Sequence, residues 1–422
     1  MRPRLQILVL VPFLAALASA QEKAPADPKV RRPPEVARIA ELRLRLDATE
    51  DPQSPLWFAR RKFRLRTFVA AVRQAARDPD IHGAILRPDH YEIGWARLFE
   101  IRAALEELRR AGKPLFCYAE SLAAADLVLA SAADRVSVPE SGMVFVPGFA
   151  VEMLYLRELL AKLHIRFEVI HIGEYKTAGE SLVRDSMSAE LKESLDPVLD
   201  EYFDSLVGTI ARGRRIPTEQ VRRAVDRGLL SAREAKAAGL VDRVEYEDQF
   251  RRGLEAFFPQ KRLEIRRDYP HEKREEIDFS NPLKLVTQLA RMMGGAKRPL
   301  PKGPKIAVVY CTGMIVSGES QYGWDGGVVA MGSKTVVKAI DRAAGNADVK
   351  AIVLRINSPG GSGLASDMIW RAVERAKQRK PVIASMGDLA ASGGYYIAMN
   401  SHRIVAEPQT ITGSIGVVGI LP

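Results

Sequence analysis

An internal repeat constrains the fold of this chain more than any other feature of its sequence. Asp80–Arg87 resembles Asp348–Arg355 at an offset of 268 residues, and Lys113–Glu120 resembles Lys380–Gly387 at an offset of 267. The order and spacing of such segments match over roughly ninety residues, so chance explains them poorly. In each copy strand-like apolar runs alternate with helical segments, which is typical of a mostly parallel sheet covered by helices. We therefore predict an α/β fold class built from two tandem units.

One copy carries a serine in a setting suited to nucleophilic catalysis. The apolar run Pro381–Ala384 leads into a turn of small residues that contains Ser392 and Gly393, and the helical segment Tyr395–Met399 follows. A hydroxyl at such a corner lies beside the N–H groups of a helix start, which can hold an oxyanion. The first copy has Ala125 at the equivalent position, so the fold does not require the hydroxyl.

The two copies also differ in the loop after the preceding strand. The second copy reads Asn357-Ser-Pro-Gly-Gly-Ser-Gly363, whereas the first has Pro88–Ile93. Gly360 and Gly361 lack side chains, so their backbone can approach a substrate closely. A purely structural alternative is that the two glycines only form a tight turn after the strand. For the differences between the two copies, the alternative is sequence drift in a redundant repeat. Because both chemical features occur in one copy, we interpret the chain as a duplicated scaffold with one active half.

The N-terminus has the pattern of a secretory signal. Arg2 and Arg4 form a basic region, Ile7–Leu17 is apolar, and Ala18–Ala20 offers an A-x-A cleavage site. Residues 1–20 are predicted to be a signal peptide, with an uncleaved membrane anchor as the alternative. In both cases the rest of the chain is expected to be exported.

Charge and cysteine content limit the class of protein further. The net charge of +11 suits docking on an anionic membrane surface. The basic clusters are scattered, with little aromatic interleaving, and with the export signal this argues against nucleic acid as a partner. Cys117 and Cys311 lie in strand-like runs and are predicted to be buried small side chains. The sequence has no CxxC, HExxH or phosphate-loop motif, so we expect no metal or other cofactor.

The chain is long enough for two cores, since it has 422 residues with 47% hydrophobic content. After the signal segment we predict a flexible leader at 21–35, a first unit at 36–270, a linker at 271–304 and a second unit at 305–422. The second copy stops soon after Thr412–Gly416, where the first copy continues with a long stretch of helix and strand. The second unit is therefore predicted to be C-terminally truncated.

Three short motifs in the second copy carry a resemblance to a known family. They are Asn357–Gly361 (NSPGG), Met386–Tyr396 (MGDLAASGGYY) and Thr412–Gly416 (TGSIG). In this order and spacing they resemble the signal peptide peptidase A family, peptidase family S49, in its long two-repeat form. The resemblance implies tandem crotonase/ClpP-like units of stacked ββα turns, which agrees with the alternation of strands and helices.

The resemblance also implies a serine–lysine dyad. Ser392 matches the nucleophile, and Lys176, in the Tyr175–Lys176 pair of the first unit, matches the general base. Ser414 matches a serine that hydrogen-bonds this lysine. A lysine acts as a base only when it is neutral, and burial favours the neutral form.

The oxyanion hole implied by the family is formed by Gly360 and Gly361 together with the N–H of Gly393. A Ser-His-Asp triad is the rival mechanism. His402 is expected at the far end of the helix that follows the serine, roughly 15 Å away. Asp388 is expected to cap the following turn instead of serving as a triad acid.

The function implied is that of a serine endopeptidase that cleaves remnant signal peptides and other hydrophobic peptides at a membrane. Its expected location is the periplasmic side of the bacterial inner membrane, and its expected assembly is a homo-oligomeric ring of four subunits. Two alternatives stay open: an acyl-CoA enzyme on the same crotonase fold, and a non-catalytic scaffold subunit if the truncated second unit does not assemble.

Overall fold

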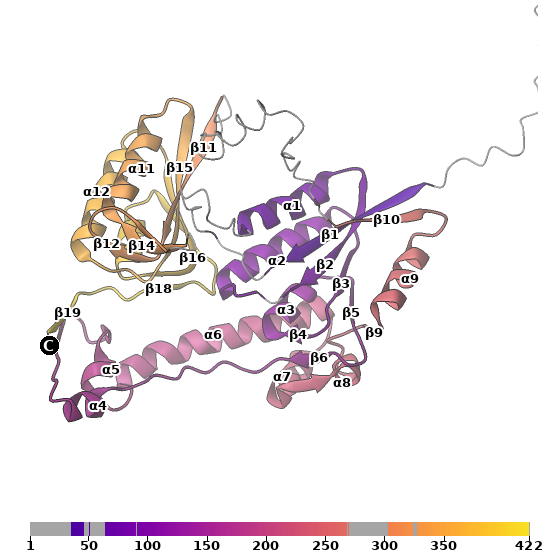
Figure 1. The fold of residues 1–422 in the computed structure, drawn as a ribbon, viewed down its shortest axis with the longest axis horizontal. Helices are drawn as coiled ribbons and strands as arrows, with labels where there is room; N and C mark the ends of the chain where they lie inside the picture. The colour runs from indigo at the N-terminus through magenta and orange to yellow at the C-terminus, as the bar shows by residue number, and fades with distance from the viewer. Residues whose placement is uncertain are drawn as a thin grey trace, which may run out of the picture.

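The computed structural model describes residues 35–45, 50, 64–89, 91–267, 269, 303–323 and 327–421. Within them the chain forms two lobes, each with its own parallel sheet (Figure 1). The predicted signal segment 1–20, the leader except Glu35 and the linker except Gly303 and Pro304 lie outside the described residues.

The first unit is built on a six-stranded sheet in which all neighbours run parallel. In spatial order the strands are β10 (Arg262–Arg266), β1 (Val36–Leu44), β2 (Ile81–Pro88), β3 (Leu115–Tyr118), β5 (Arg135–Val138) and β9 (Arg243–Val244). The central strands are apolar on both faces because helices cover both sides. One face packs against α1 (Leu65–Arg77), α2 (Trp95–Arg110) and α3 (Ala124–Ala130). The other packs against α9 (Glu247–Phe257) through Phe250 and Leu254.

The second unit repeats this plan on a smaller parallel sheet. Its strands are β11 (Lys305–Thr312), β15 (Val349–Ser358), β16 (Val382–Ala391) and β17 (Arg403–Val405), with β18 (Ile411–Gly413) also paired to β16. Its core includes α11 (Ser333–Gly345), α12 (Gly363–Lys377) and α13 (Gly393–Met399). α1 and α11 both have 13 residues, and their first residues lie 268 positions apart. The predicted α/β class with two tandem units is thus confirmed.

Each unit adds a small three-stranded sheet beside the main one. These sheets consist of β4 (Leu122–Ala123), β6 (Met143–Phe145) and β8 (Leu229–Ser231) in the first unit, and β12 (Met314–Val316), β14 (Val328–Gly332) and β13 (Gln321–Tyr322) in the second.

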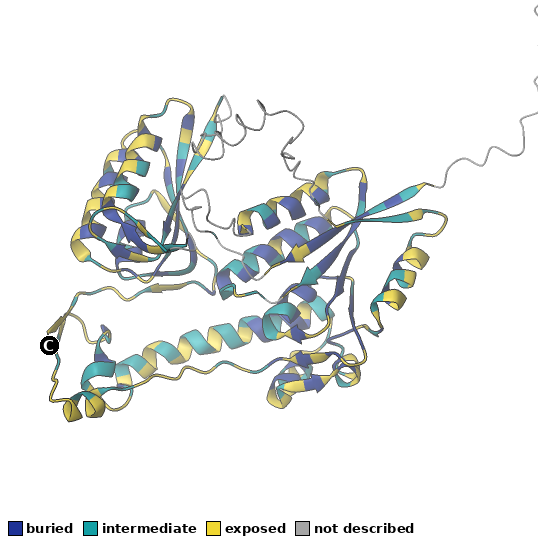
Figure 2. Ribbon diagram, viewed as in Figure 1, coloured by how far each residue is buried: buried dark blue, intermediate teal, exposed yellow. Residues whose placement is uncertain are grey.

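A long helix joins the first core to a mostly exposed segment (Figure 2). This helix is α6 (Ala189–Arg214), which packs in the first core through Leu206 and Ile210 near its C-terminal end. The exposed segment before it holds α4 (Arg157–Lys162), β7 (Glu168–His171) and α5 (Glu180–Val183), and α7 (Thr218–Arg227) and α8 (Ala232–Ala237) follow α6.

The last strand of the second unit, β19 (Val418–Leu421), pairs antiparallel with β7 of the first. The two units are therefore joined by a sheet as well as by the chain. None of the described helices is long and apolar enough to cross a membrane.

Candidate active site

A serine lies at the corner between a strand and a helix of the second unit. β16 ends at Ala391, α13 begins at Gly393, and Ser392 between them has φ 50° and ψ −115°. This left-handed backbone is strained for a residue with a side chain, and such strain clusters at functional sites. The first N–H groups of α13 have no acceptor within the helix, so the corner combines a hydroxyl with open donors.

A second serine follows the neighbouring strand in the same way. β18 pairs in parallel with the end of β16, so that Gly413 lies opposite Ala391, and the Ser392 N–H donates to the Gly413 carbonyl at 2.8 Å. Ser414 is the next residue and also has φ 50°. Two serines therefore leave two adjacent parallel strands at the same edge of the sheet.

One lysine amine meets both serines. Lys176 belongs to the loop after β7 in the first unit and is only 4% exposed. Its Nζ lies 3.2 Å from Ser392 Oγ, 2.9 Å from Ser414 Oγ and 2.7 Å from the Ser414 carbonyl oxygen. The structure thus brings together, within one chain, three residues singled out from the sequence, although 216 positions separate Lys176 from Ser392.

The pairing of β7 with β19 carries the lysine to the serines. The Ile172 N–H donates to the Val417 carbonyl at 3.1 Å, which extends that pairing toward the site. Gly416 lies against the lysine stem, because a Cβ there would stand 2.7 Å from the Ile172 carbonyl oxygen and 3.3 Å from Lys176 Cγ. Sequence reasoning missed this pairing and this role of Gly416; the available signal was its place in the third motif.

A buried carboxylate fixes the loop that carries Lys176. Glu180 is 6% exposed and accepts hydrogen bonds from the N–H and the hydroxyl of Ser188 at 2.5 and 2.8 Å. Ser188 is the N-cap of α6. The Tyr175 hydroxyl donates to Glu193, within α6, at 2.9 Å. The loop is tied at two points to the first turns of α6, which supports the position of the lysine.

Burial lowers the pKa of Lys176 below its ordinary value. A neutral amine has two N–H donors and one lone pair. The carbonyl and the hydroxyl of Ser414 can accept the two donors, which leaves the lone pair for the hydroxyl proton of Ser392. This is the arrangement that a general base needs.

The lowered pKa of Lys176 predicts how reactions at this pair depend on pH. The amine is a base only when deprotonated, so the rate should rise with pH through the pKa of Lys176 and then level off. Because burial lowers this pKa, the midpoint should fall below the ~10.4 of a free lysine. The second-order rate of Ser392 labelling by a fluorophosphonate, followed from acid to alkaline pH, measures it. A midpoint at or above the free-lysine value would contradict the assignment.

Gly360 differs from its predicted role as an oxyanion donor. Its N–H donates to Ser358 Oγ at 3.1 Å, and its carbonyl accepts from the Ile315 N–H at 2.8 Å, so this amide is already engaged. Gly360 instead packs its backbone against the Ser392 corner. Gly361 forms an isolated β-bridge with Ile315. The roles of Gly361 and Gly393 as oxyanion donors stay predictions.

The histidine named for a rival triad lies away from the serine. α13 ends at Met399, so His402 is not on that helix as predicted. His402 Nδ1 accepts from the Val382 N–H at 3.0 Å. Val382 begins β16, whereas Ser392 follows its end, and His402 therefore lies at the opposite end of this strand.

Asp388 also departs from its predicted role, because its carboxylate caps no local turn but contacts Arg97 of the first unit.

Cys117 and Cys311 are buried free thiols, as predicted. Among the residues that the structure describes, no group of three or more His, Cys, Asp or Glu side chains could hold a metal ion.

Comparison with known proteins relates this chain to a family of peptidases. The model of peptidase family S49 matches residues 107–257 and 374–422, and these ranges contain Lys176 and Ser392. The chain is 31% identical over 345 residues to "Serine protease SPPA, chloroplastic" of Arabidopsis thaliana, which aligns 82% of this chain with 48% of that protein. It is 33% identical over 372 residues to "Protease 4" of Haemophilus influenzae, which aligns 86% of this chain with 57% of that protein.

Among solved structures, a 1510-N membrane-bound stomatin-specific protease with a substrate peptide aligns at a TM-score of 0.34 and 11% identity, covering 60% of this chain and 98% of that one. The chain spans about half the length of the curated relatives that it matches.

Proposed function

This chain belongs to peptidase family S49, and on that premise we propose that it is a serine endopeptidase with Ser392 as nucleophile and Lys176 as general base. The observation that carries the proposal is the 3.2 Å approach of a buried lysine amine to the hydroxyl of a serine with strained backbone. Family membership supports the class of enzyme, and this geometry supports the two reacting atoms.

The proposed reaction begins when Lys176 Nζ takes the proton of Ser392 Oγ as the oxygen attacks a peptide carbonyl carbon. The carbonyl electron pair moves onto its oxygen, where the N–H groups of Gly393 and Gly361 are the proposed donors. Collapse of this intermediate breaks the C–N bond, and the lysine ammonium gives its proton to the leaving amine. A water deprotonated by Lys176 then hydrolyses the ester and restores both residues. Ser414 holds the amine in place through its two oxygens.

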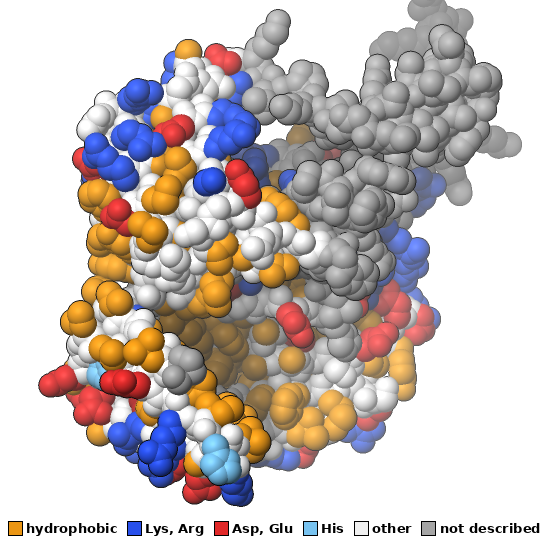
Figure 3. Space-filling view, turned by 60° about the vertical axis from the view of Figure 1, so that its left-hand side comes forward, with side chains coloured by type: hydrophobic (Ala, Val, Ile, Leu, Met, Phe, Trp, Pro, Cys, Tyr) orange, Lys and Arg blue, Asp and Glu red, His pale blue; other side chains and the backbone are white. Residues whose placement is uncertain are grey.

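The surroundings of the dyad favour apolar, extended peptides as substrates. Ile172, Ile415 and Val417 lie within four positions of Lys176 or Ser414 in the chain and are 72%, 75% and 68% exposed. In the face shown in Figure 3, hydrophobic side chains border a hollow in the surface. We propose remnant signal peptides and similar hydrophobic segments as substrates, bound as an added strand.

The proposed setting is the membrane surface on the exported side, supported by the signal-like residues 1–20 and the net charge of +11. Exposed apolar side chains around α4, namely Leu154, Leu159 and Leu163, support a homo-oligomeric ring. A monomeric mass in light scattering of the full chain would exclude the ring.

The substrate class is tested with two peptides of equal length. The first has an uninterrupted apolar run, and the second has two residues of that run replaced by Lys and Asp. We expect the full chain to cleave the apolar peptide at least about tenfold faster, because charged side chains would have to be desolvated. The Ser392→Ala variant is the control for contaminating proteases.

Equal cleavage of both peptides would overturn the apolar preference. A folded protein in which a fluorophosphonate does not label Ser392 would point to a non-catalytic scaffold. Saturable binding of coenzyme A would point to the acyl-CoA alternative.

A further inference from the structure

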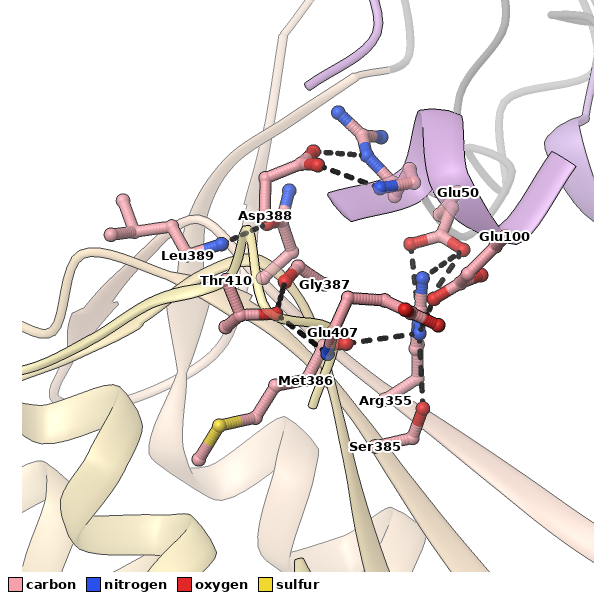
Figure 4. A network of polar contacts seen from close by, with 12 residues as sticks. Glu50, Glu100, Arg355, Ser385, Met386, Gly387, Asp388, Leu389, Glu407 and Thr410 are labelled. Atoms are coloured by element: carbon pink, nitrogen blue, oxygen red, sulfur yellow. Dashed lines mark hydrogen bonds and ion pairs between the residues drawn. The ribbon is translucent and has the colours of Figure 1, made fainter. Parts of the chain in front are cut away.

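Helix α2 of the first unit has no capping side chain of its own. Its N-cap is Gly94, and the carboxylate of Asp388, from the second unit, lies in that place (Figure 4). Asp388 Oδ1 accepts the N–H of Arg97, the third helical residue, at 3.0 Å, and its other oxygen contacts the Arg97 guanidinium. An oxygen that accepts from the second or third N–H completes a helix N-terminus. Asp388 therefore caps α2 across the boundary between the units.

The sequence of α2 leaves room for this cap. A Cβ at Gly94 would overlap the carboxyl group of Asp388. The side chains of Asp388 and Arg97 are 18% and 15% exposed, so water screens their interaction only partly. The contact thus requires a glycine at position 94 of the first unit and the carboxylate of Asp388 in the second.

A second charged contact lies one helical turn further along α2. Glu100 accepts from Arg355 Nη1 at 2.6 Å, and the same nitrogen donates to Ser385 Oγ in β16 at 3.0 Å. Glu50 accepts from Arg355 Nε at 3.0 Å. α2 therefore presents the cation Arg97 and then the anion Glu100 to the second unit. The second unit presents the anion Asp388 and the cation Arg355 to them (Figure 4).

These contacts join α2, in the core of the first unit, to the strand that leads to the nucleophile. α2 is held in the first core by Leu98 and Ile101, which are fully buried. Asp388 lies four residues before Ser392, and the next residue, Leu389, is fixed to the second unit because its N–H donates to Asn357 Oδ1 at 3.0 Å. The nucleophile comes from the second unit and the base from the first, so their separation depends on how the units meet.

We propose that Asp388 is a positioning residue, which sets the distance between Ser392 and Lys176 by capping α2 of the other unit. This inference rests on the proposed serine–lysine dyad. Asp388 touches neither residue of the dyad and acts only through the placement of β16. Loss of the cap should therefore slow the chemical step and leave the peptide-binding surface largely as it is.

The experiment compares Asp388→Ala, Asp388→Asn and the control Glu107→Ala in the full chain, with an apolar peptide as substrate. Glu107 is also on α2, but its ion pair with Arg73 is exposed and stays within the first unit. We expect Asp388→Ala to lower kcat by about 10- to 100-fold with little change in KM, since small misplacements of reacting groups have effects of this size. Asp388→Asn keeps an oxygen for the Arg97 N–H and should recover most of kcat. Glu107→Ala should match the unchanged protein.

Gly94→Ala tests the same contact from the first unit, and it carries the test if Asp388→Ala does not fold. It should lower kcat and the rate of fluorophosphonate labelling together. Wild-type kcat in Asp388→Ala and Gly94→Ala, with Ser392→Ala inactive, would overturn the positioning role and leave the dyad intact. Full activity in Ser392→Ala would instead overturn the dyad itself.

Discussion

Replacing Ser392 by alanine is expected to lower kcat/KM for peptide cleavage by about 10⁴-fold or more, and Lys176→Met should do the same. The two side chains act as a unit, because Oγ attacks only as Nζ takes its proton across the 3.2 Å that separates them. The double variant should therefore be no less active than either single variant. Steady-state kinetics with an apolar reporter peptide, at protein concentrations high enough to detect the residual rate, measures all three.

Lys192→Met is the matched control for the lysine, since Lys192 is exposed on α6 of the same unit. It should retain full activity. Ser414→Ala should have a smaller effect than the dyad variants, because the carbonyl of residue 414 still accepts from Nζ. Retention of more than about a tenth of the activity in Ser392→Ala or Lys176→Met would remove that residue from the reaction, since loss of a dyad member costs far more.

The dyad variants should lose activity without losing their fold. Burial lowers the pKa of Lys176 in the folded state, so between the folded and unfolded pKa values the unfolded chain binds more protons, and stability rises with pH. Below the folded pKa the full cost of burying the charged amine is present. Methionine removes that cost, and Lys176→Met should unfold at the same or a higher temperature near neutral pH. Thermal unfolding followed by circular dichroism separates this outcome from simple destabilisation.

Local patterns in the sequence predicted local structure well. The predicted alternation of strand-like and helical runs is found in the first unit, where the helix Trp95–Arg110 is followed by the strands Leu115–Tyr118 and Arg135–Val138. The repeat also singled out Ser392, because Ala125 holds the equivalent place in the other copy. Such features depend on apolar periodicity and turn residues, which act over a few positions.

Contacts between the units could not be predicted in this way. Lys176 was named only through the family resemblance, since its own neighbours are ordinary loop residues. The sequence around Asp388 predicts a cap of its own turn, but the partner of Asp388 lies 291 positions away on α2. The pairing of β7 with β19 was missed for the same reason: each strand is four residues long, and neither shows which partner it meets.

Gly360→Ala is expected to lower kcat/KM by about 100-fold, although Gly360 is not an oxyanion donor in this structure. A Cβ at this position would stand 2.6 Å from the Gly393 nitrogen and 2.8 Å from Ser392 Cβ, and the glycine has φ 99°. The new methyl group has no flexible neighbour to displace, so the serine corner must move. A shift of about 1 Å at the nucleophile has an effect of this order. Peptide kinetics and the rate of fluorophosphonate labelling should fall together.

Gly363→Ala is the matched control, three residues further along the same loop at the start of α12. A Cβ there would meet no atom within 4 Å, and alanine is the better helix former. This variant should keep full activity and unfold at the same or a higher temperature. Wild-type labelling of Ser392 in Gly360→Ala would show that the corner tolerates the methyl group. In that case the close packing of Gly360 would not be needed to hold the strained backbone of Ser392, whose N–H and carbonyl are bonded to Gly413 and Tyr396.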